Sequence, residues 1–177
     1  MFHKIHYDSI HEFQDFLSDD EHDYLLNKIN NYSEEGWWDK DFEEMSPNWY
    51  GRNIWSTEDV VLQNAHQRML NLFKSYDYAT PFAALSRYRP GESMGEHEDE
   101  IGVKTIQYGA VLYINDDYLG GEICYPSFNF CIKPKARSLV LHPGNLTHSV
   151  KPVLDGPTRY MSTSFVHGSD EKPAILK

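Results

Sequence analysis

The feature that most constrains the fold is the regular succession of short β-prone runs and turns after residue 80. The runs are rich in Val, Ile, Tyr, Phe and Thr, and turn-forming Gly, Pro, Asn and Asp separate them. Several short strands at this spacing are typical of a β-sandwich or barrel. We therefore predict strands at about 82–89, 105–114, 121–126, 129–133, 137–142, 147–153 and 158–166.

Helical patterns dominate the chain before residue 80. Ser18, followed three residues later by Glu21, matches a capping box, in which the two side chains accept hydrogen bonds from free backbone N–H groups of the first turn. Leu25 and Ile29 then continue one apolar face. We therefore predict a helix over about 19–31.

A second helix is predicted over about 57–75, with Ser56 or Thr57 as its N-cap. Its apolar residues recur at helical spacing and should form a buried stripe. The stripe consists of Val61, Ala65, Met69, Leu72 and Tyr76.

Length and composition favour one domain with a packed core. The 177 residues suffice for a single core, and a hydrophobic content of 40% argues against global disorder. We predict one domain over 1–177, with a helical support over about 1–79 and a β core over about 80–167. The aromatic segment 32–56 has no period. We interpret it as a lid over a substrate, with a cover for a sheet edge as the alternative.

Charge and cysteine content limit the partners and the compartment. The formal net charge of −11 argues against nucleic-acid binding and accommodates a basic partner. The chain has no apolar run long enough to span a membrane and no N-terminal signal pattern, so we expect a soluble, cytoplasmic protein without a membrane partner. Cys124 and Cys131 could face each other across a hairpin, but in a reducing compartment we predict two free thiols.

The pair His97 and Asp99 is the starting point for the chemistry. On an extended backbone, residues two apart project to the same face, so the imidazole and the carboxylate converge while Glu98 points away. A second histidine from a distant strand would complete a two-histidine, one-carboxylate facial triad. Such a triad binds Fe(II) and leaves three positions open for O₂ and a bidentate co-substrate.

Among the nine histidines, His148 is the preferred third ligand and His142 is its rival. His148 begins the run His-Ser-Val-Lys-Pro-Val after a Pro-Gly-Asn turn, and Arg159 follows eleven residues later. A strand, a turn and a returning strand would place Arg159 beside His148 on the neighbouring strand. The guanidinium could there bind the far carboxylate of a dicarboxylate ligand, and His142 lacks such a downstream partner.

Further motifs stand in a fixed order around these residues. They are Tyr88-x-Pro-Gly, His97-x-Asp99, Val111-Leu-Tyr-Ile-Asn-Asp, Gly120-Gly-Glu, Pro134 and His148-Ser-Val-x-Pro-Val-x-x-Gly-Pro-Thr-Arg159-Tyr. Over about 80–167 the chain resembles the 2-oxoglutarate/Fe(II) oxygenase superfamily, in particular its prolyl 4-hydroxylase-like branch. The ordered set is far more specific than an isolated His-x-Asp.

The resemblance implies an α+β, mainly β fold, a double-stranded β-helix (jelly roll) with N-terminal helices packed on one sheet. It implies Fe(II) held by His97, Asp99 and His148, and 2-oxoglutarate held by Arg159 with help from Tyr88. The oxidant would be O₂, with ascorbate as an accessory reductant. Many members have Lys where this chain has Arg159, which leaves the co-substrate assignment intact and makes the sub-branch less specific.

The substrate pocket is expected to include Phe165, Tyr113 and Trp55. The function that the resemblance implies is prolyl 4-hydroxylation of a peptide or protein, which we expect to be basic or proline-containing. One alternative is the same chemistry on another amino-acid side chain or a small metabolite. Another is a non-catalytic, cupin-like metal-binding module.

Overall fold

The computed structural model describes residues 1–31, 38–39, 52–55, 59–82, 84–100, 105–168 and 175. Apart from the backbone of two short strands, the predicted lid over 32–56 lies outside the described residues. The elements in chain order are β1 (Phe2–His6), β2 (Ile10–Gln14), α1 (Asp19–Asn30), β3 (Trp38–Asp39), β4 (Arg52–Trp55), α2 (Val60–Leu70), β5 (Tyr78–Ala79), β6 (Ala84–Tyr88), β7 (Met94–His97), β8 (Ile106–Tyr113), β9 (Ile123–Tyr125), a 3-10 turn (Pro126–Phe128), β10 (Phe130–Ile132), β11 (Leu139–Pro143), β12 (His148–Val150) and β13 (Arg159–His167).

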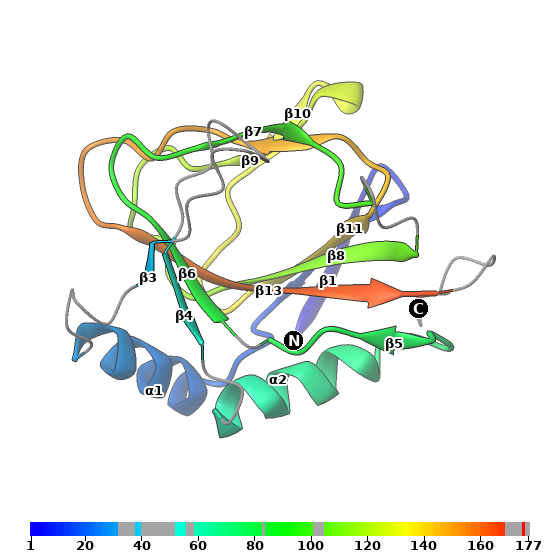
Figure 1. Ribbon diagram of the computed structural model, residues 1–177, viewed down its shortest axis with the longest axis horizontal. Coiled ribbons are helices and arrows are strands. Elements are labelled where there is room, and N and C mark those ends of the chain that lie inside the picture. Colours follow the sequence, from blue (N-terminus) through cyan, green and yellow to red (C-terminus); the bar gives the residue numbers. More distant parts are fainter. Residues whose placement is uncertain are drawn as a thin grey trace.

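The strands form two antiparallel sheets that face each other (Figure 1). The large sheet has the order β1-β2-β11-β8-β13-β6-β4-β3, with β5 paired to β13, and the small sheet has the order β10-β9-β12-β7. In Figure 1 the small sheet lies above the large one, and the two helices lie below it. The prediction of a mainly β, two-sheet fold is confirmed. The full connectivity of a double-stranded β-helix stays a prediction.

The large sheet separates two apolar clusters, and β8 shows how the sequence produces both. Successive side chains of a strand point to opposite faces. Ala110 and Leu112 therefore join the cluster between the large sheet and the helices, whereas Val111 and Tyr113 join the cluster between the two sheets. Because β8 is covered on both faces, it is almost entirely buried and carries no charged residue, and Gln107 is its only partly buried member.

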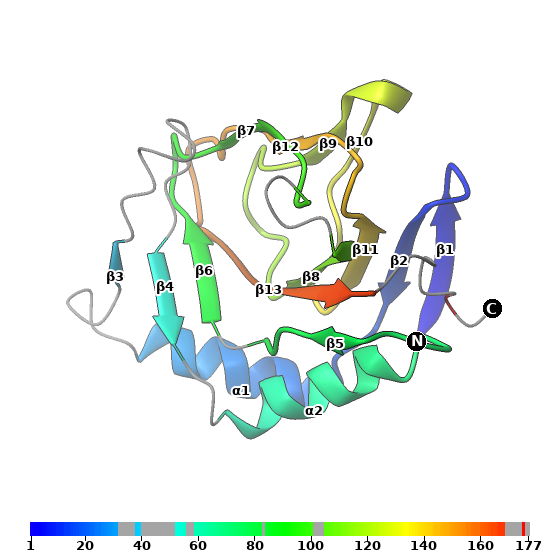
Figure 2. The same cartoon turned by 45° about the vertical axis from the view of Figure 1, so that its right-hand side comes forward.

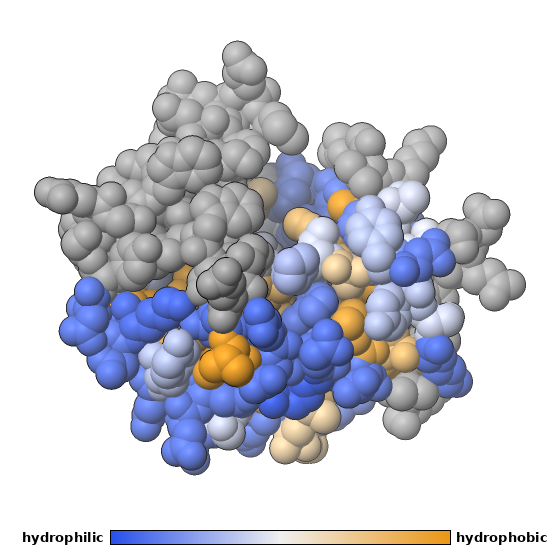
Figure 3. Space-filling view, turned by 60° about the horizontal axis from the view of Figure 1, so that its bottom comes forward, coloured by the Kyte–Doolittle hydropathy of each residue, from blue (hydrophilic) through white to orange (hydrophobic). Residues whose placement is uncertain are grey.

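Helix α1 begins where the sequence predicts. The Ser18 hydroxyl accepts the Glu21 N–H, and the Glu21 carboxylate accepts the Ser18 N–H, which completes the capping box. Leu25 and Ile29 are buried, and they belong to an apolar cluster that also contains residues of the large sheet. Figure 3 shows a mostly hydrophilic outer surface on the side of the helices, as an amphipathic pair requires.

Helix α2 is shorter than predicted, and its N-cap is Asp59 rather than Ser56 or Thr57. The Asp59 carboxylate accepts hydrogen bonds from two N–H groups of the first turn and from Lys28 Nζ of α1 at 2.6 Å. The carboxylate therefore satisfies free donors and also joins the two helices. The predicted stripe is buried only over its first three members, and Tyr76 is exposed. No helix in the described ranges has the length and apolar character needed to cross a membrane.

The N-terminal hairpin β1–β2 was not predicted, and the helical support over about 1–79 is wrong in this part. Strand β2 pairs with β11, so the hairpin extends the large sheet at one edge (Figure 2). Ile10 packs between the two sheets, whereas Phe13 packs between the large sheet and the helices. Burial on both faces removes the simple alternation that would have revealed the strand.

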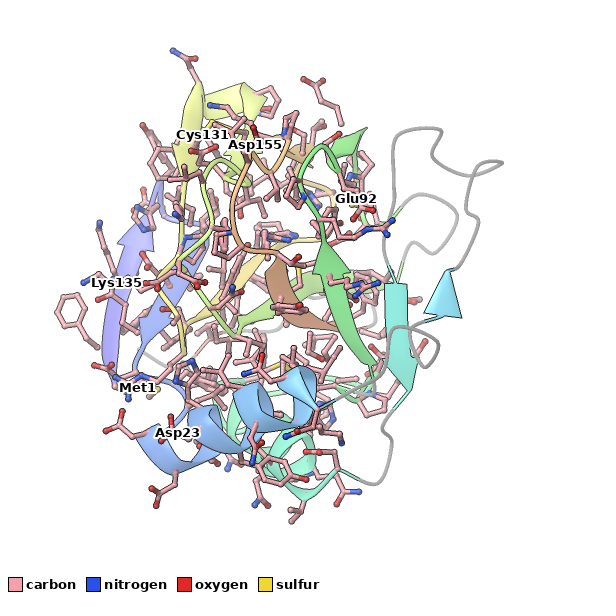
Figure 4. All side chains as sticks on the ribbon, turned by 90° about the vertical axis from the view of Figure 1, so that its left-hand side faces the viewer. Met1, Asp23, Glu92, Cys131, Lys135 and Asp155 are labelled. Atoms are coloured by element: carbon pink, nitrogen blue, oxygen red, sulfur yellow. A yellow bond between two sulfur atoms is a disulfide. The ribbon has the colours of Figure 1, made fainter. Side chains whose placement is uncertain are left out.

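The two cysteines form a disulfide, so the prediction of free thiols is wrong. Cys124 in β9 and Cys131 in β10 are directly opposed in the hairpin register, with Cα atoms 4.0 Å apart. Figure 4 shows Cys131 at the end of the molecule opposite Asp23 in α1. The crosslink therefore closes the outer hairpin of the small sheet, next to β12.

Candidate metal centre and anion pocket

Three potential metal ligands converge at one end of the small sheet. His97 ends β7 and His148 begins β12, and the two residues are directly opposed in the antiparallel register. Asp99 follows two residues after β7, with its Oδ1 atom 3.7 Å from the Nε2 atoms of both histidines. One donor atom from each residue lies within 4.8 Å of the other two, a spacing that could hold a metal ion.

The backbone around Asp99 differs from the extended segment that the sequence suggested. Strand β7 ends at His97, and Asp99 lies in a turn, so the carboxylate reaches the site from beyond the strand end. The Glu100 N–H donates to the Gly144 carbonyl at 3.0 Å, which ties this turn to the loop after β11. Glu98 points to Thr147, whose hydroxyl donates to its carboxylate at 2.9 Å.

Backbone carbonyls orient both ligand imidazoles. His97 Nδ1 lies 2.9 Å from the Gly95 carbonyl, and His148 Nδ1 lies 2.9 Å from the Leu146 carbonyl. A carbonyl oxygen only accepts hydrogen bonds, so in each ring Nδ1 carries the proton and donates it. Each Nε2 therefore presents a lone pair toward Asp99, as a metal-binding histidine requires.

The electrostatics favour the deprotonated forms that bind metals. Burial, together with the nearby imidazole of His142, lowers the pKa of His148 to about 3. Burial by itself would raise the pKa of Asp99, but the hydrogen bond from His142 and the three surrounding imidazoles outweigh it, so this pKa is lowered. At neutral pH the site thus offers a neutral imidazole at His148 and an ionised carboxylate at Asp99.

His142, the rival ligand, also contacts the site. It is buried in β11, and its Nε2 atom lies 3.1 Å from Asp99 Oδ2, whereas the 3.7 Å distances to His97 and His148 involve Oδ1. The Tyr125 hydroxyl lies 3.3 Å from the other ring nitrogen, Nδ1. The sequence marked His142 as a candidate ligand but gave no sign of these two hydrogen bonds.

Arg159 is buried, with 1% of its surface exposed, among aromatic rings. Its guanidinium lies 4.9 Å from the ring centre of Tyr88 and 5.0 Å from that of Tyr113, whose hydroxyl is 3.3 Å from Nη2. Within the described ranges no carboxylate pairs with Arg159, and its Nε has no hydrogen-bond partner. A buried cation without an acid is expensive unless an anion can bind to it.

The sequence suggested that Arg159 lies on the strand next to His148, but the two residues lie in different sheets. Strand β12 belongs to the small sheet and β13 to the large one, so the connecting segment crosses from one sheet to the other. Tyr125 bridges the two parts, since its ring lies 6.3 Å from that of His148 and packs in the apolar cluster that contains Tyr88. The guanidinium and the metal donors therefore border the same interior between the sheets.

The other residues predicted for the site are Tyr88, Phe165 and Trp55, and they lie on three different strands. The Tyr88 hydroxyl lies 3.5 Å from the sulfur of Met94. Phe165 is half-buried and pairs with Gly109 of β8, so it shares the inner face of the large sheet with Gly109. Trp55 pairs through its backbone with the start of β6, and its side chain lies outside the described residues.

Tyr118 was not predicted as a site residue, and Gly121 was noted only as part of the motif Gly120-Gly-Glu. Tyr118 is fully buried, and burial raises the pKa of its hydroxyl to about 12. A Cβ atom at Gly121 would lie 3.0 Å from the Tyr118 ring and 3.1 Å from Arg159 Cδ, so the glycine allows the two side chains to meet. The Gly120-Gly121 pair in the sequence was a signal for this close approach, but Tyr118 had none.

The family model described as the 2OG-Fe(II) oxygenase superfamily matches residues 83–167. The curated proteins contain no match to the chain.

Similar solved structures include three prolyl hydroxylases. The viral collagen prolyl hydroxylase of Paramecium bursaria Chlorella virus-1, solved as a 2OG complex, is 20% identical, with 90% of this chain and 96% of that chain covered and a TM-score of 0.64. The Pseudomonas putida prolyl-4-hydroxylase is 18% identical, with 90% of this chain and 92% of that chain covered and a TM-score of 0.67. The Trichoplax adhaerens prolyl hydroxylase, in complex with a hypoxia inducible factor peptide fragment, is 16% identical, with 94% of this chain and 86% of that chain covered and a TM-score of 0.76. At these identities the likeness shows a shared fold.

Proposed function

We propose that this chain, whose residues 83–167 match the family model of the 2OG-Fe(II) oxygenase superfamily, is an Fe(II)- and 2-oxoglutarate-dependent hydroxylase with His97, Asp99 and His148 as iron ligands. One observation carries this proposal. Two imidazole nitrogens and one carboxylate oxygen meet within 4.8 Å, and a buried guanidinium that has no acid partner in the described chain borders the same interior.

The donor set suits Fe(II). Two neutral imidazoles and one carboxylate on one side of a metal leave three positions for other ligands, which is the arrangement of non-haem iron oxygenases. Both Nε2 lone pairs are free because the Nδ1 atoms donate to the carbonyls of Gly95 and Leu146. When bound, iron and 2-oxoglutarate would together activate O₂, which is the oxidant. The chain holds them in place and keeps water away from the reaction.

The pocket around Arg159 suits the distal carboxylate of 2-oxoglutarate. The guanidinium can form two parallel hydrogen bonds with a carboxylate. The hydroxyl of Tyr113 already lies beside it, and Tyr88 packs its ring against it. We propose that Arg159 binds the co-substrate and that Tyr88 and Tyr113 line its binding pocket.

A cytoplasmic location stays a prediction from the sequence, and the Cys124–Cys131 disulfide argues against it. We propose a proline residue in a peptide or protein as the substrate, hydroxylated at carbon 4. Structural neighbours named as prolyl hydroxylases support this choice, and one of them was solved with a peptide fragment. The net charge of −11 favours a basic peptide and disfavours nucleic acid. We place Phe165 in the substrate pocket, because it pairs with Gly109 on the inner face of the large sheet.

The test is turnover by the pure protein. With Fe(II), ascorbate and 2-oxoglutarate, we expect slow formation of succinate that increases when proline-containing basic peptides are added, together with hydroxyproline detected by mass spectrometry. His148→Ala should abolish both signals, whereas His66→Ala in α2, which removes a similarly buried histidine, should retain them. Stimulation only by other amino acids or metabolites would redirect the substrate. Metal binding without any succinate would instead indicate a cupin-like binding module.

A further inference from the structure

The two oxygens of Asp99 have different surroundings. Oδ1 lies 3.7 Å from the Nε2 atoms of both His97 and His148. Oδ2 lies 3.1 Å from Nε2 of His142. One oxygen is therefore available to a metal, while the other is already engaged in a hydrogen bond.

The hydrogen bond from His142 belongs to a buried chain of three side chains. A carboxylate only accepts hydrogen bonds, so Nε2 of His142 is the donor to Asp99. In the neutral ring Nδ1 then accepts, and the Tyr125 hydroxyl at 3.3 Å donates to it. His142 is 1% exposed and Tyr125 is fully buried, so water does not compete for these bonds.

Gly109 provides the space in which Asp99 and His142 meet. It is directly opposite His142 in the register of β8 and β11. A Cβ atom at this position would overlap Asp99 Oδ2 and would lie 2.6 Å from His142 Nε2. Any side chain larger than hydrogen would thus push the carboxylate and the imidazole apart.

We propose that His142 is a positioning residue that keeps Asp99 bound to iron through one oxygen only, that Tyr125 fixes the tautomer of His142, and that Gly109 makes room for the contact. The proposal rests on the iron site described above. If Asp99 bound through both oxygens, it would occupy one of the three positions that O₂ and the co-substrate need. Hydrogen bonds to ligand side chains commonly change metal affinity by about 10–100-fold.

The test uses Co(II) as a probe of the metal site, without turnover. His142→Leu removes the donor and fills a similar volume, and we expect roughly 10–100-fold weaker Co(II) binding with an altered d–d absorption spectrum. His142→Gln supplies an amide N–H in place of Nε2–H and should restore most of the affinity and the spectrum. Tyr125→Phe should give a smaller loss, about twofold to tenfold.

A matched control separates positioning from general loss of packing. His167 is as buried as His142 and lies in the same large sheet, where it bonds Thr105 and stacks on Tyr78. His167→Leu should lower stability without changing the Co(II) spectrum. If His142→Leu does not fold, the Gln and Phe variants carry the test, and a wild-type affinity and spectrum in Tyr125→Phe would then count against the proposal.

Two results would overturn the role of His142. One is an unchanged affinity and spectrum in folded His142→Leu. The other is Cu(II) electron paramagnetic resonance that shows three bound imidazoles in the wild type and two in this variant, because His142 would then be a ligand itself. Failure of the iron site is distinguishable, since it would appear as wild-type metal binding in His148→Ala.

Discussion

Replacement of Arg159 by Met tests the anion pocket most directly. Burial of an unpaired cation costs several kcal/mol. The two ring contacts offset about 2 kcal/mol each, and the hydrogen bond to Tyr113 adds about 1.5–3 kcal/mol. These effects nearly cancel. We therefore expect Arg159→Met to change the free energy of unfolding by less than about 2 kcal/mol when 2-oxoglutarate is absent.

The large effect of Arg159→Met should appear only with the co-substrate. At 2-oxoglutarate concentrations near 100 times its Kd, the wild type gains about 2.7 kcal/mol. For a domain of this size, that gain raises Tm by roughly 5–10 °C. Arg159→Met should show almost no rise, and Arg159→Lys an intermediate one, because lysine keeps the charge but loses the planar fork.

Thermal denaturation of the Fe(II)-loaded protein under anaerobic conditions measures this difference without turnover. Arg87→Met is the matched control, since Arg87 is also buried but precedes Tyr88 in β6 and so projects to the opposite face of the sheet. It should retain the full rise in Tm. A full rise in Arg159→Met, or an equal loss of iron binding and 2-oxoglutarate binding, would refute the assigned role of the guanidinium.

Three further predictions follow from the site and its surroundings. Gly109→Ala should weaken metal binding by roughly tenfold or more in a metal titration and lower the free energy of unfolding by about 1–3 kcal/mol, and unchanged binding would contradict the steric argument at Asp99. Reduction of the Cys124–Cys131 disulfide, with its sequence separation of 7, should lower that free energy by about 2–3 kcal/mol in urea denaturation, and the double Ser variant should lose as much and ignore reductant. Burial lowers the pKa of His148 from 6.5 to about 3, so from about pH 6 to pH 4 the unfolded chain binds a proton that the metal-free native state refuses. As the pH is lowered over this range, the free energy of unfolding should therefore decrease by up to about 1.4 kcal/mol per pH unit, and His148→Gln should remove this part of the slope.

Local signals in the sequence predicted the parts of the fold that depend on neighbours along the chain. The Ser18–Glu21 capping box determines where α1 begins, because its hydrogen bonds involve residues three apart. Turn residues predicted the boundaries of most strands after residue 80 to within a few residues, as for β13 at Arg159–His167. The order of His97, Asp99 and His148 could be recognised because their types and spacing suit one chemistry.

Contacts between distant segments were beyond such signals. The direction of the segment between β12 and β13 depends on which sheet β13 joins, and eleven residues are compatible with either a hairpin or a crossing. The thiols of Cys124 and Cys131 were judged by compartment, although the pairing of β9 with β10 places them directly opposite each other. Strand β2 was missed because both of its faces are buried.

The choice between His142 and His148 depends on which nitrogen of each ring carries the proton, because only a nitrogen without a proton can bind a metal. Both residues begin or interrupt apolar runs, and both imidazoles reach Asp99. At His148 a backbone carbonyl takes the Nδ1 proton and leaves the Nε2 lone pair free for a metal. At His142 the Nε2 atom faces Asp99 Oδ2, which only accepts, so the proton stays on Nε2 and Nδ1 of the neutral ring accepts from the Tyr125 hydroxyl. Two histidines six residues apart thus present Nε2 to the same carboxylate in opposite forms, one with a lone pair and one with a proton, because of hydrogen bonds that only the folded chain provides.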